Sequence, residues 1–418
     1  RLRPDATTPN LKDKSEMPIP ELHLAHRLKD IAPSSMMRLA AEAAELRRQG
    51  RDIIGLSTGE PDLDTPLHIQ EAAISAMRGG DTHYTDIDGT LALKEAIQRK
   101  FDRENGLKFN IDEISVSAGA KQVIYNAFSA TIDEGDEVII PTPYYSPYID
   151  MARVLGGREK IVSTSADNGF KMKAQDLETA ITDRSRWLVL NSPSNPSGSV
   201  YSASELAELA DVLEKHPHVW LLSDDIYEHI LFRGQFTTMA KVRPFMANRT
   251  LTVNGVSKAY CMTGWRIGYA GGPKQLIKAM RTVQSQVTTC PPSINQAAAV
   301  AALDGPEDVL AKIRSVFLER RDVVVSGLNA VPGIDCPVPE GAFYAFPSCE
   351  GLLGQKTQTQ TIANDQDFAR YLLDAANVMV VPGSAFGVPN RLRISFAADI
   401  AQLTEACRRI AAAVADLK

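Results

Sequence analysis

A set of chemically versatile side chains lies at or after the ends of a series of short apolar runs. The set comprises Asn195, Asp224, Tyr227, Ser257, Lys258 and Arg266. Ligands of open parallel sheets bind outside the carboxyl ends of the strands, so these positions predict one shared site. The stretch SAGAK (117–121) has small residues before an expected helix, and its backbone N–H groups could face an anion.

A lysine, an aspartate, a phenol, an amide and an anion-binding turn together are typical of a pyridoxal phosphate site. Lys258 would form a Schiff base with the cofactor, and Asp224 would keep the pyridinium nitrogen protonated. Each feature alone has a simpler explanation, because a lone lysine is usually a solvated charge and an aspartate after a strand is usually a helix N-cap. The order and joint occurrence of the features favour the cofactor site.

The apolar runs that must position these residues alternate with helical patterns. The runs are EVIIP (137–141), SRWLVLNSP (185–193), VWLLSDD (219–225), TLTVNG (250–255) and RIGYAGG (266–272), and helical spacing covers 66–79, 90–105 and 121–131. Runs that are apolar on both faces are typical of parallel strands covered on two sides. The sequence therefore predicts an α/β domain.

The two ends of the chain have a different pattern. Helical spacing covers 34–49 before a strand-like DIIGLS, and a long amphipathic helix is expected over 306–330. Short strands in GAFYAFP, VMVVPG and LRISFA then mix with helices expected at 365–376 and 399–416. We predict a small α+β domain from 21–65 and 306–418, a large cofactor-binding domain from 66–305, and a flexible tail at 1–20 without assigned function.

Composition excludes several classes of protein. The chain has 418 residues, of which 44% are hydrophobic and 23% charged, and its net charge of −6 argues against a nucleic-acid partner. Its five cysteines are scattered without metal-ligand spacing, which predicts no metal site and reduced thiols in the cytoplasm. No apolar run approaches the roughly 18 residues needed to span a bilayer, and no signal-like region follows the basic start. We expect no membrane partner and no export.

Several motifs in a fixed order resemble one known family. They are GEPDLDTP (59–66), HYTDIDGTLALKEAI (83–97), SAGAKQ (117–122), NSPSNPSG (191–198), SDDIYEH (223–229), SKAYCMTGWRIGY (257–269) and LRISFA (392–397). The sequence resembles the class I/II pyridoxal-phosphate aminotransferases of fold type I, and most closely the bacterial aspartate aminotransferase branch. The resemblance implies a large domain with a mostly parallel, seven-stranded sheet, a smaller α+β domain from both termini, and a homodimer with shared active sites.

The resemblance also implies roles for individual residues. Lys258 would bind pyridoxal 5'-phosphate covalently and then act as the general base. The other implied cofactor-binding residues are Gly119, Ala120, Lys121, Tyr145, Asn195, Asp224, Tyr227, Ser257, Arg266 and, from the other subunit, Tyr84. Arg393 would bind the substrate α-carboxylate with help from the main chain of Gly59, and Arg391 is a competitor for that role.

The sequence supports two different preferences for the side chain of the substrate. Lys121 falls where relatives place a lysine near a distal carboxylate, which favours aspartate and glutamate. Met36 and Met37 favour an apolar or aromatic side chain instead, although packing against the core explains them equally well. Cys290 and Pro292 also depart from relatives that have Asn and Thr there.

The predicted function is a ping-pong aminotransferase that moves an amino group from aspartate or glutamate to a 2-oxo acid such as 2-oxoglutarate. The alternatives are an aromatic or broad-specificity aminotransferase and a lyase or synthase on the same fold with the same cofactor. A transcription regulator of this fold is disfavoured, because no helix-turn-helix pattern precedes residue 25.

Other polar residues are expected to have structural roles. We interpret His216 and His218 as surface residues and His83 and His229 as structural ones. Glu60 and Asp62 are expected to fix the loop near the domain hinge.

Overall fold

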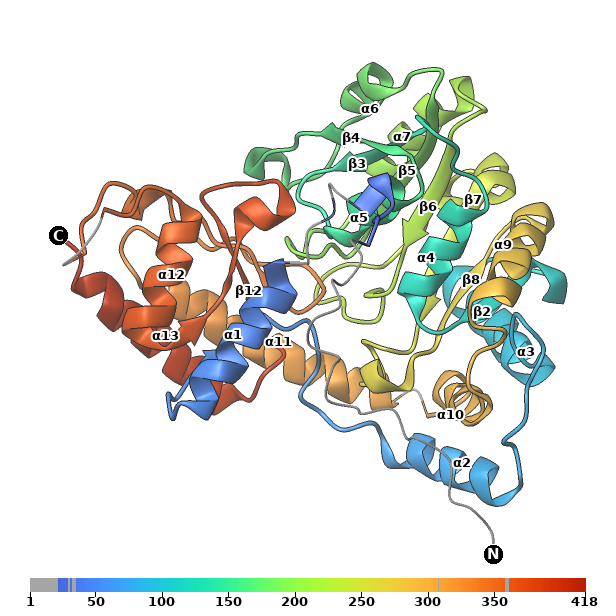
Figure 1. The fold of residues 1–418 in the computed structure, drawn as a ribbon, viewed down its shortest axis with the longest axis horizontal. Coiled ribbons are helices and arrows are strands. Elements are labelled where there is room, and N and C mark those ends of the chain that lie inside the picture. The colour runs from blue at the N-terminus through green and yellow to red at the C-terminus, as the bar shows by residue number, and fades with distance from the viewer. Residues whose placement is uncertain (1–21, 29–30, 32–34, 307, 358–360) are drawn as a thin grey trace, which may run out of the picture.

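The centre of the molecule is a seven-stranded sheet (Figure 1). The computed structural model describes residues 22–28, 31, 35–306, 308–357 and 361–418, without the side chains of 35–37. The predicted tail at 1–20 lies outside these residues. The strands are β2 (Ile114–Ser117), β3 (Glu137–Pro141), β4 (Arg158–Val162), β5 (Ser185–Asn191), β6 (Trp220–Asp224), β7 (Thr250–Gly255) and β8 (Gly268–Gly271), in the spatial order β2-β8-β7-β6-β5-β3-β4.

The sheet is mostly parallel, as the sequence predicts. Strands β4, β3, β5, β6 and β7 pair in parallel, whereas β8 runs antiparallel to both β7 and β2. The register places Asn191, the last residue of β5, beside Asp224, the last residue of β6. Polar residues that follow these strands therefore meet at one edge of the sheet.

Apolar residues on both sides of the strands explain the unbroken runs in the sequence. Val138 and Ile140 of β3 pack on one face with α4 (Ala120–Ser129), α5 (Pro147–Val154) and α9 (Lys274–Val287). Ile139, between them, packs on the opposite face with α6 (Ala174–Ala180) and α7 (Ala203–Lys215). Successive strand residues point to opposite faces, so a strand that is covered on both sides can be apolar along its whole length, as the centre of β3 is.

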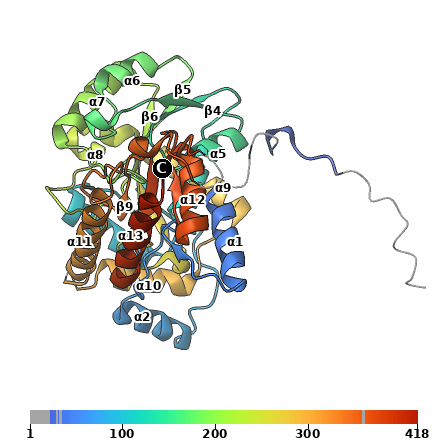
Figure 2. The same ribbon diagram turned by 90° about the vertical axis from the view of Figure 1, so that its left-hand side faces the viewer.

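The two ends of the chain come together at the side of this layered structure. Strand β1 (Ile54–Gly55) pairs in parallel with β10 (Val378–Met379), and β12 (Leu392–Ser395) lies between β11 (Val381–Pro382) and β9 (Tyr344–Ala345). Helices α1 (Ser35–Arg48), α11 (Asp308–Asn329), α12 (Asp365–Ala376) and α13 (Ile400–Ala415) lie on the same side of the molecule (Figure 2). The expected long helix and the helix at 365–376 are confirmed.

The remaining helices complete the molecule. They are α2 (Leu67–Arg78), α3 (Leu91–Lys100), α8 (Met239–Val242) and α10 (Ser293–Leu303), with 3₁₀ turns η1 (His26–Leu28), η3 (Ile111–Glu113), η4 (Ala166–Asn168), η5 (Pro244–Arg249), η6 (Thr263–Trp265), η7 (Glu350–Leu352) and η8 (Gly383–Phe386). The helix expected at 90–105 is α3 followed by a π-helical turn, η2 (Phe101–Asn105). Among the described residues, no helix has the length and apolar character needed to cross a membrane.

Two strands of the large sheet have no counterpart among the predicted runs. The β4 sequence REKIV buries only Val162, since the strand lies at the edge of the sheet. The β2 sequence ISVS is fully buried, but it has only four residues and two of them are serines. Neither pattern has the continuous apolar character from which the other strands were predicted.

Candidate active site

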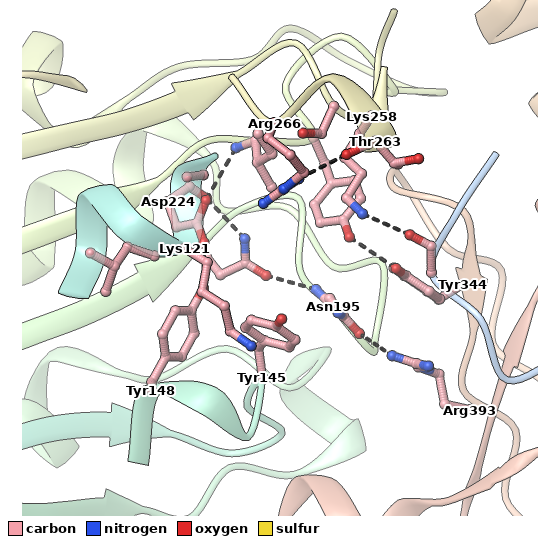
Figure 3. A pocket seen from close by; sticks show the side chains of 17 residues that line it. Lys121, Tyr145, Tyr148, Asn195, Asp224, Lys258, Thr263, Arg266, Tyr344 and Arg393 are labelled. Atoms are coloured by element: carbon pink, nitrogen blue, oxygen red, sulfur yellow. Dashed lines mark hydrogen bonds between the residues drawn. The ribbon is translucent and has the colours of Figure 1, made fainter. Parts of the chain in front are cut away.

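A pocket lies at the carboxyl ends of β5, β6 and β7, between these strand ends and the segments around Gly59, Tyr344 and Arg393 (Figure 3). The predicted residues that line it are Gly59, Ala120, Lys121, Tyr145, Asn195, Asp224, Tyr227, Ser257, Lys258, Arg266 and Arg393. The predicted site residues that do not line it are Gly119 and Tyr84. Gly119 lies directly behind it as the N-cap of α4, whereas Tyr84 is 89% exposed on the surface.

Lys258 follows β7 and points into the pocket. Its Nζ donates a hydrogen bond of 2.7 Å to the main-chain oxygen of Gly59. Burial lowers the pKa of Lys258 to about 8, with smaller contributions from the nearby cations Arg266 and Arg393 and an opposing effect of Glu60 and Asp224. About a fifth of this lysine is therefore a neutral amine at about pH 7.4, far more than at its ordinary pKa of 10.5.

Asp224 ends β6 at the floor of the pocket. The Tyr148 hydroxyl donates to its Oδ2 at 2.5 Å, and the Asn191 side chain donates to its main-chain oxygen at 2.9 Å. Burial raises the pKa of Asp224 to about 6, while the Tyr148 hydrogen bond lowers it. The same Asn191 side chain accepts from the main-chain N–H of Asn195 at 2.8 Å, so one amide connects the two strand ends.

The N-terminus of α4 and Arg266 form a positively charged corner of the pocket. Gly119 has φ +94°, a conformation that favours glycine, and a Cβ there would overlap the Arg266 guanidinium. The guanidinium donates to the main-chain oxygens of Thr263 at 2.8 Å and Ala118 at 3.4 Å. Backbone N–H groups at a helix N-terminus beside an arginine are suited to hold a phosphate group.

Arg393 lies on the opposite side of the pocket and is 1% exposed. Its Nη1 donates to Asn195 Oδ1 at 3.1 Å, and its Nη2 donates to the main-chain oxygen of Ser57. The buried Nε has no hydrogen-bond partner among the described residues. Arg391, the competitor, donates instead to the main-chain oxygen of Phe346 at 3.0 Å and does not line the pocket.

The pocket also contains polar residues that were not predicted from the sequence. They are Tyr148, Asn191, Thr263 and Tyr344. Asn191 opens the NSPSNPSG motif and Thr263 lies within SKAYCMTGWRIGY, so both could have been found from their motifs. A tyrosine in an apolar helix or strand looks the same as a core residue in sequence, so Tyr148 and Tyr344 had no distinguishing signal.

Contacts outside the pocket involve the remaining polar candidates. Glu60 accepts from the Thr263 hydroxyl, and Asp62 pairs with Arg320 of α11 at 2.6 Å. His229 contacts Glu104 at 2.8 Å, and His216 contacts Glu178 at 3.2 Å. His218 lies 3.0 Å from the main-chain oxygen of Thr182. Met36 and Met37 belong to the first turn of α1, but their side chains lie outside the described residues.

Residues 51–410 of the chain match the model of the protein family "Aminotransferase class I and II". An aspartate aminotransferase from Rhizobium meliloti (strain 1021) is 55% identical over 93% of this chain and 95% of its own length. An aspartate/prephenate aminotransferase from Cereibacter sphaeroides is 50% identical over 94% of this chain and 99% of its own.

Solved structures agree with this assignment. The crystal structure of the aspartate aminotransferase from Rhizobium meliloti matches with a TM-score of 0.93 and 54% identity, over 95% of this chain and all of that one. The Thermus thermophilus aspartate aminotransferase with maleate matches with a TM-score of 0.88 and 40% identity, over 94% of this chain and all of that one. The fold is therefore fold type I, as expected. This chain belongs to the class I and II aminotransferases, and it is an enzyme that transfers amino groups.

Proposed function

We propose that this aminotransferase uses pyridoxal 5'-phosphate to move the amino group of aspartate or glutamate to a 2-oxo acid such as 2-oxoglutarate. The observation that carries the proposal is the convergence of Lys258, Asp224, Arg266 and Arg393 on one pocket. The names of relatives at 50–55% identity support aspartate as a substrate.

The residues present fit the cofactor. The absence of a side chain at Gly119 lets the Arg266 guanidinium lie directly against the N-terminus of α4, so that both present their N–H groups at one corner of the pocket. There the main chain of Gly119, Ala120 and Lys121, with Arg266 and Ser257, would hold the phosphate. The residues that would hold the ring are Asp224 at the pyridinium nitrogen, Asn195 and Tyr227 at the phenolic oxygen, and Tyr145 against the ring face.

When bound, the cofactor supplies an electron-withdrawing ring that stabilises negative charge at the substrate Cα. Lys258 anchors it and, once released, moves a proton at that carbon as a general base, since its pKa of about 8 suits proton transfer near neutral pH. Asp224 has a pKa of about 6 before it gains a cationic partner, and such a partner would favour its ionised form.

Arg393 is the proposed anchor of the substrate α-carboxylate. Its buried Nε has a free proton and its guanidinium is fixed by Asn195 and Ser57. A carboxylate that accepts from this group would satisfy a donor that is otherwise costly to bury. The main chain of Gly59 would assist at the same end of the substrate.

Lys121 is the proposed anchor of the distal carboxylate. Its side chain lines the pocket, and its Nζ lies 5.9 Å from the centre of the Tyr145 ring. Burial lowers the pKa of Lys121, while Asp150 raises it. A partly desolvated cation gains more from a carboxylate than a fully solvated one, which favours dicarboxylic substrates.

A broader substrate range is a second candidate, because the Cereibacter sphaeroides relative is named for aspartate and prephenate. Prephenate has a ring in addition to its carboxylates, so a site for both must tolerate bulk beside Lys121. The aromatic or broad-specificity aminotransferase, which the sequence offered as an alternative, corresponds to this second candidate.

The proposal includes a homodimer in the cytoplasm. The exposure of Tyr84 supports the dimer, since a residue outside its own pocket is free to reach a partner's phosphate site. The pairing of β1 with β10 supports one small domain from 21–65 and 306–418 beside a large domain from 66–305.

The experiment is a single-turnover absorbance measurement. The cofactor-loaded protein is mixed separately with L-aspartate, L-glutamate, L-phenylalanine and L-alanine, without any oxo acid. We expect aspartate and glutamate to bleach the absorbance, and Lys258→Ala to abolish the reaction. The Lys121→Met variant should lose about 100-fold in kcat/KM for aspartate, the scale of a lost desolvated ion pair, but little for phenylalanine. Bleaching only by phenylalanine would contradict the dicarboxylate assignment.

A further inference from the structure

Tyr344 lies at the junction of three parts of the pocket (Figure 3). It belongs to β9, is 1% exposed, and its hydroxyl oxygen lies 2.9 Å from that of Tyr227. The Arg393 guanidinium lies over its ring, 4.8 Å from the ring centre. The backbone of Gly59 abuts its hydroxyl so closely that a Cβ at Gly59 would overlap the oxygen.

These contacts fix the phenol without giving it an ionic partner. Among the described residues, the Tyr344 hydroxyl has one hydrogen-bond partner, the hydroxyl of Tyr227. The charged and titratable groups around the two phenols are Arg393 and Tyr145, which interact with both, and Tyr148, which interacts with Tyr227. Burial raises the pKa of Tyr227 and of Tyr344, so both keep their protons across the neutral range.

The hydrogen-bond inventory then decides the direction of the bond. Each phenol carries one proton and two acceptor lone pairs. If Tyr227 donates its proton to the phenolic oxygen of the cofactor, it cannot also donate to Tyr344. The bond of 2.9 Å between the two hydroxyls must then run from Tyr344 to Tyr227.

We propose that Tyr344 is a positioning residue that donates its proton to Tyr227 and thereby directs the Tyr227 proton toward the cofactor's phenolic oxygen. This inference rests on the proposed function. Two hydrogen bonds in series polarise one another, so Tyr227 donates more strongly with Tyr344 behind it. Tyr344 acts through Tyr227 and does not touch the reacting atoms.

The test is a pH titration of the absorbance of bound pyridoxal phosphate in the whole enzyme. A weaker donor at the phenolic oxygen leaves more negative charge there, and this charge holds the proton more tightly on the nitrogen that joins Lys258 to the cofactor. We expect Tyr344→Phe to raise the titration midpoint by about half a pH unit, the scale of a modestly weakened hydrogen bond. Tyr227→Phe should raise the midpoint further.

The double variant decides whether the effect passes through Tyr227. The Y227F/Y344F protein should titrate like Y227F alone, because the Tyr344 proton then has no phenol to orient. A Y344F protein with the wild-type midpoint, or a shift that adds in full to that of Y227F, would overturn the proposal.

Three controls separate this inference from other failures. Tyr371→Phe removes a hydroxyl that donates to the Ala413 main chain at 2.7 Å, outside the pocket, and should leave the midpoint unchanged. Tyr344→Phe keeps the ring under Arg393, so the KM for aspartate should change little, whereas Tyr344→Leu should raise it. A wild-type protein that gains no absorbance from pyridoxal phosphate would contradict the proposed function itself.

Discussion

The Nζ atom of Lys258 donates a hydrogen bond of 2.7 Å to the main-chain oxygen of Gly59, a residue 199 positions earlier in the chain. This contact joins the turn after β7 to the loop after β1, so the lysine is held where the large sheet meets the N-terminal segment. Burial in this junction disfavours the charged amine, which is why its pKa falls from 10.5 to about 8.

The buried lysine should make the stability of the cofactor-free protein depend on pH. The unfolded chain binds this proton up to pH 10.5 and the folded chain only to about 8, so the free energy of unfolding should rise with pH through this window. Between pH 7 and 9.5, urea unfolding should detect a gain of about 2 kcal/mol in wild type relative to Lys258→Met. Equal pH dependence in both proteins would show that Lys258 is not desolvated.

Arg393 and Arg391 provide a matched pair of variants. Both are largely buried arginines, but only Arg393 lines the pocket. Arg393→Gln should lower kcat/KM for aspartate by about 100-fold or more, since a charged hydrogen bond to the carboxylate is lost. Arg391→Gln should affect the free energy of unfolding more than kcat/KM. Equal kinetic losses in the two variants would contradict the assignment of Arg393.

Tyr148 should help to set the pKa of the Asp224 carboxyl group. Its hydroxyl donates to the carboxylate at 2.5 Å and lowers the pKa of Asp224, so Tyr148→Phe should raise this pKa above its present value of about 6. A higher pKa increases the protonated fraction of this carboxyl group, and the protonated form binds the pyridinium nitrogen less well. Fluorescence titration should find pyridoxal phosphate bound about tenfold more weakly at pH 6, with a smaller loss at pH 8. A loss that is independent of pH would indicate a packing effect instead.

Lys100 should be essential for stability. It is fully buried, contacts Glu228 directly, and shares that carboxylate with Asn105 at 2.6 Å and Asn254 at 2.7 Å. Lys100→Met leaves a buried anion without its cation and should lower the free energy of unfolding by about 3–5 kcal/mol. The double variant K100M/E228Q, measured by the same urea unfolding, should recover part of this loss. No recovery would mean that Lys100 stabilises by packing alone.

The sequence determined the large sheet and most of the pocket. Strands β3, β5 and β6 are apolar on both faces because helices cover both, and that burial is visible in the residues themselves. Tyr145, Asn195 and Tyr227 follow these strands, Ser257 and Lys258 follow β7, and Asp224 ends β6, since the ends of parallel strands meet at one edge. Edge strand β4 was missed because it buries a single residue.

Only the tertiary structure showed that Tyr148 and Tyr344 also line the pocket. Tyr344 meets Tyr227 because β9 pairs with β12 opposite Ser395, in a part of the chain far from β6. Tyr148 meets Asp224 because α5 packs on the face of the sheet at the end of β6. A sequence pattern reports whether one element is buried, whereas contacts between distant elements depend on strand order, register and helix packing, which no local pattern encodes.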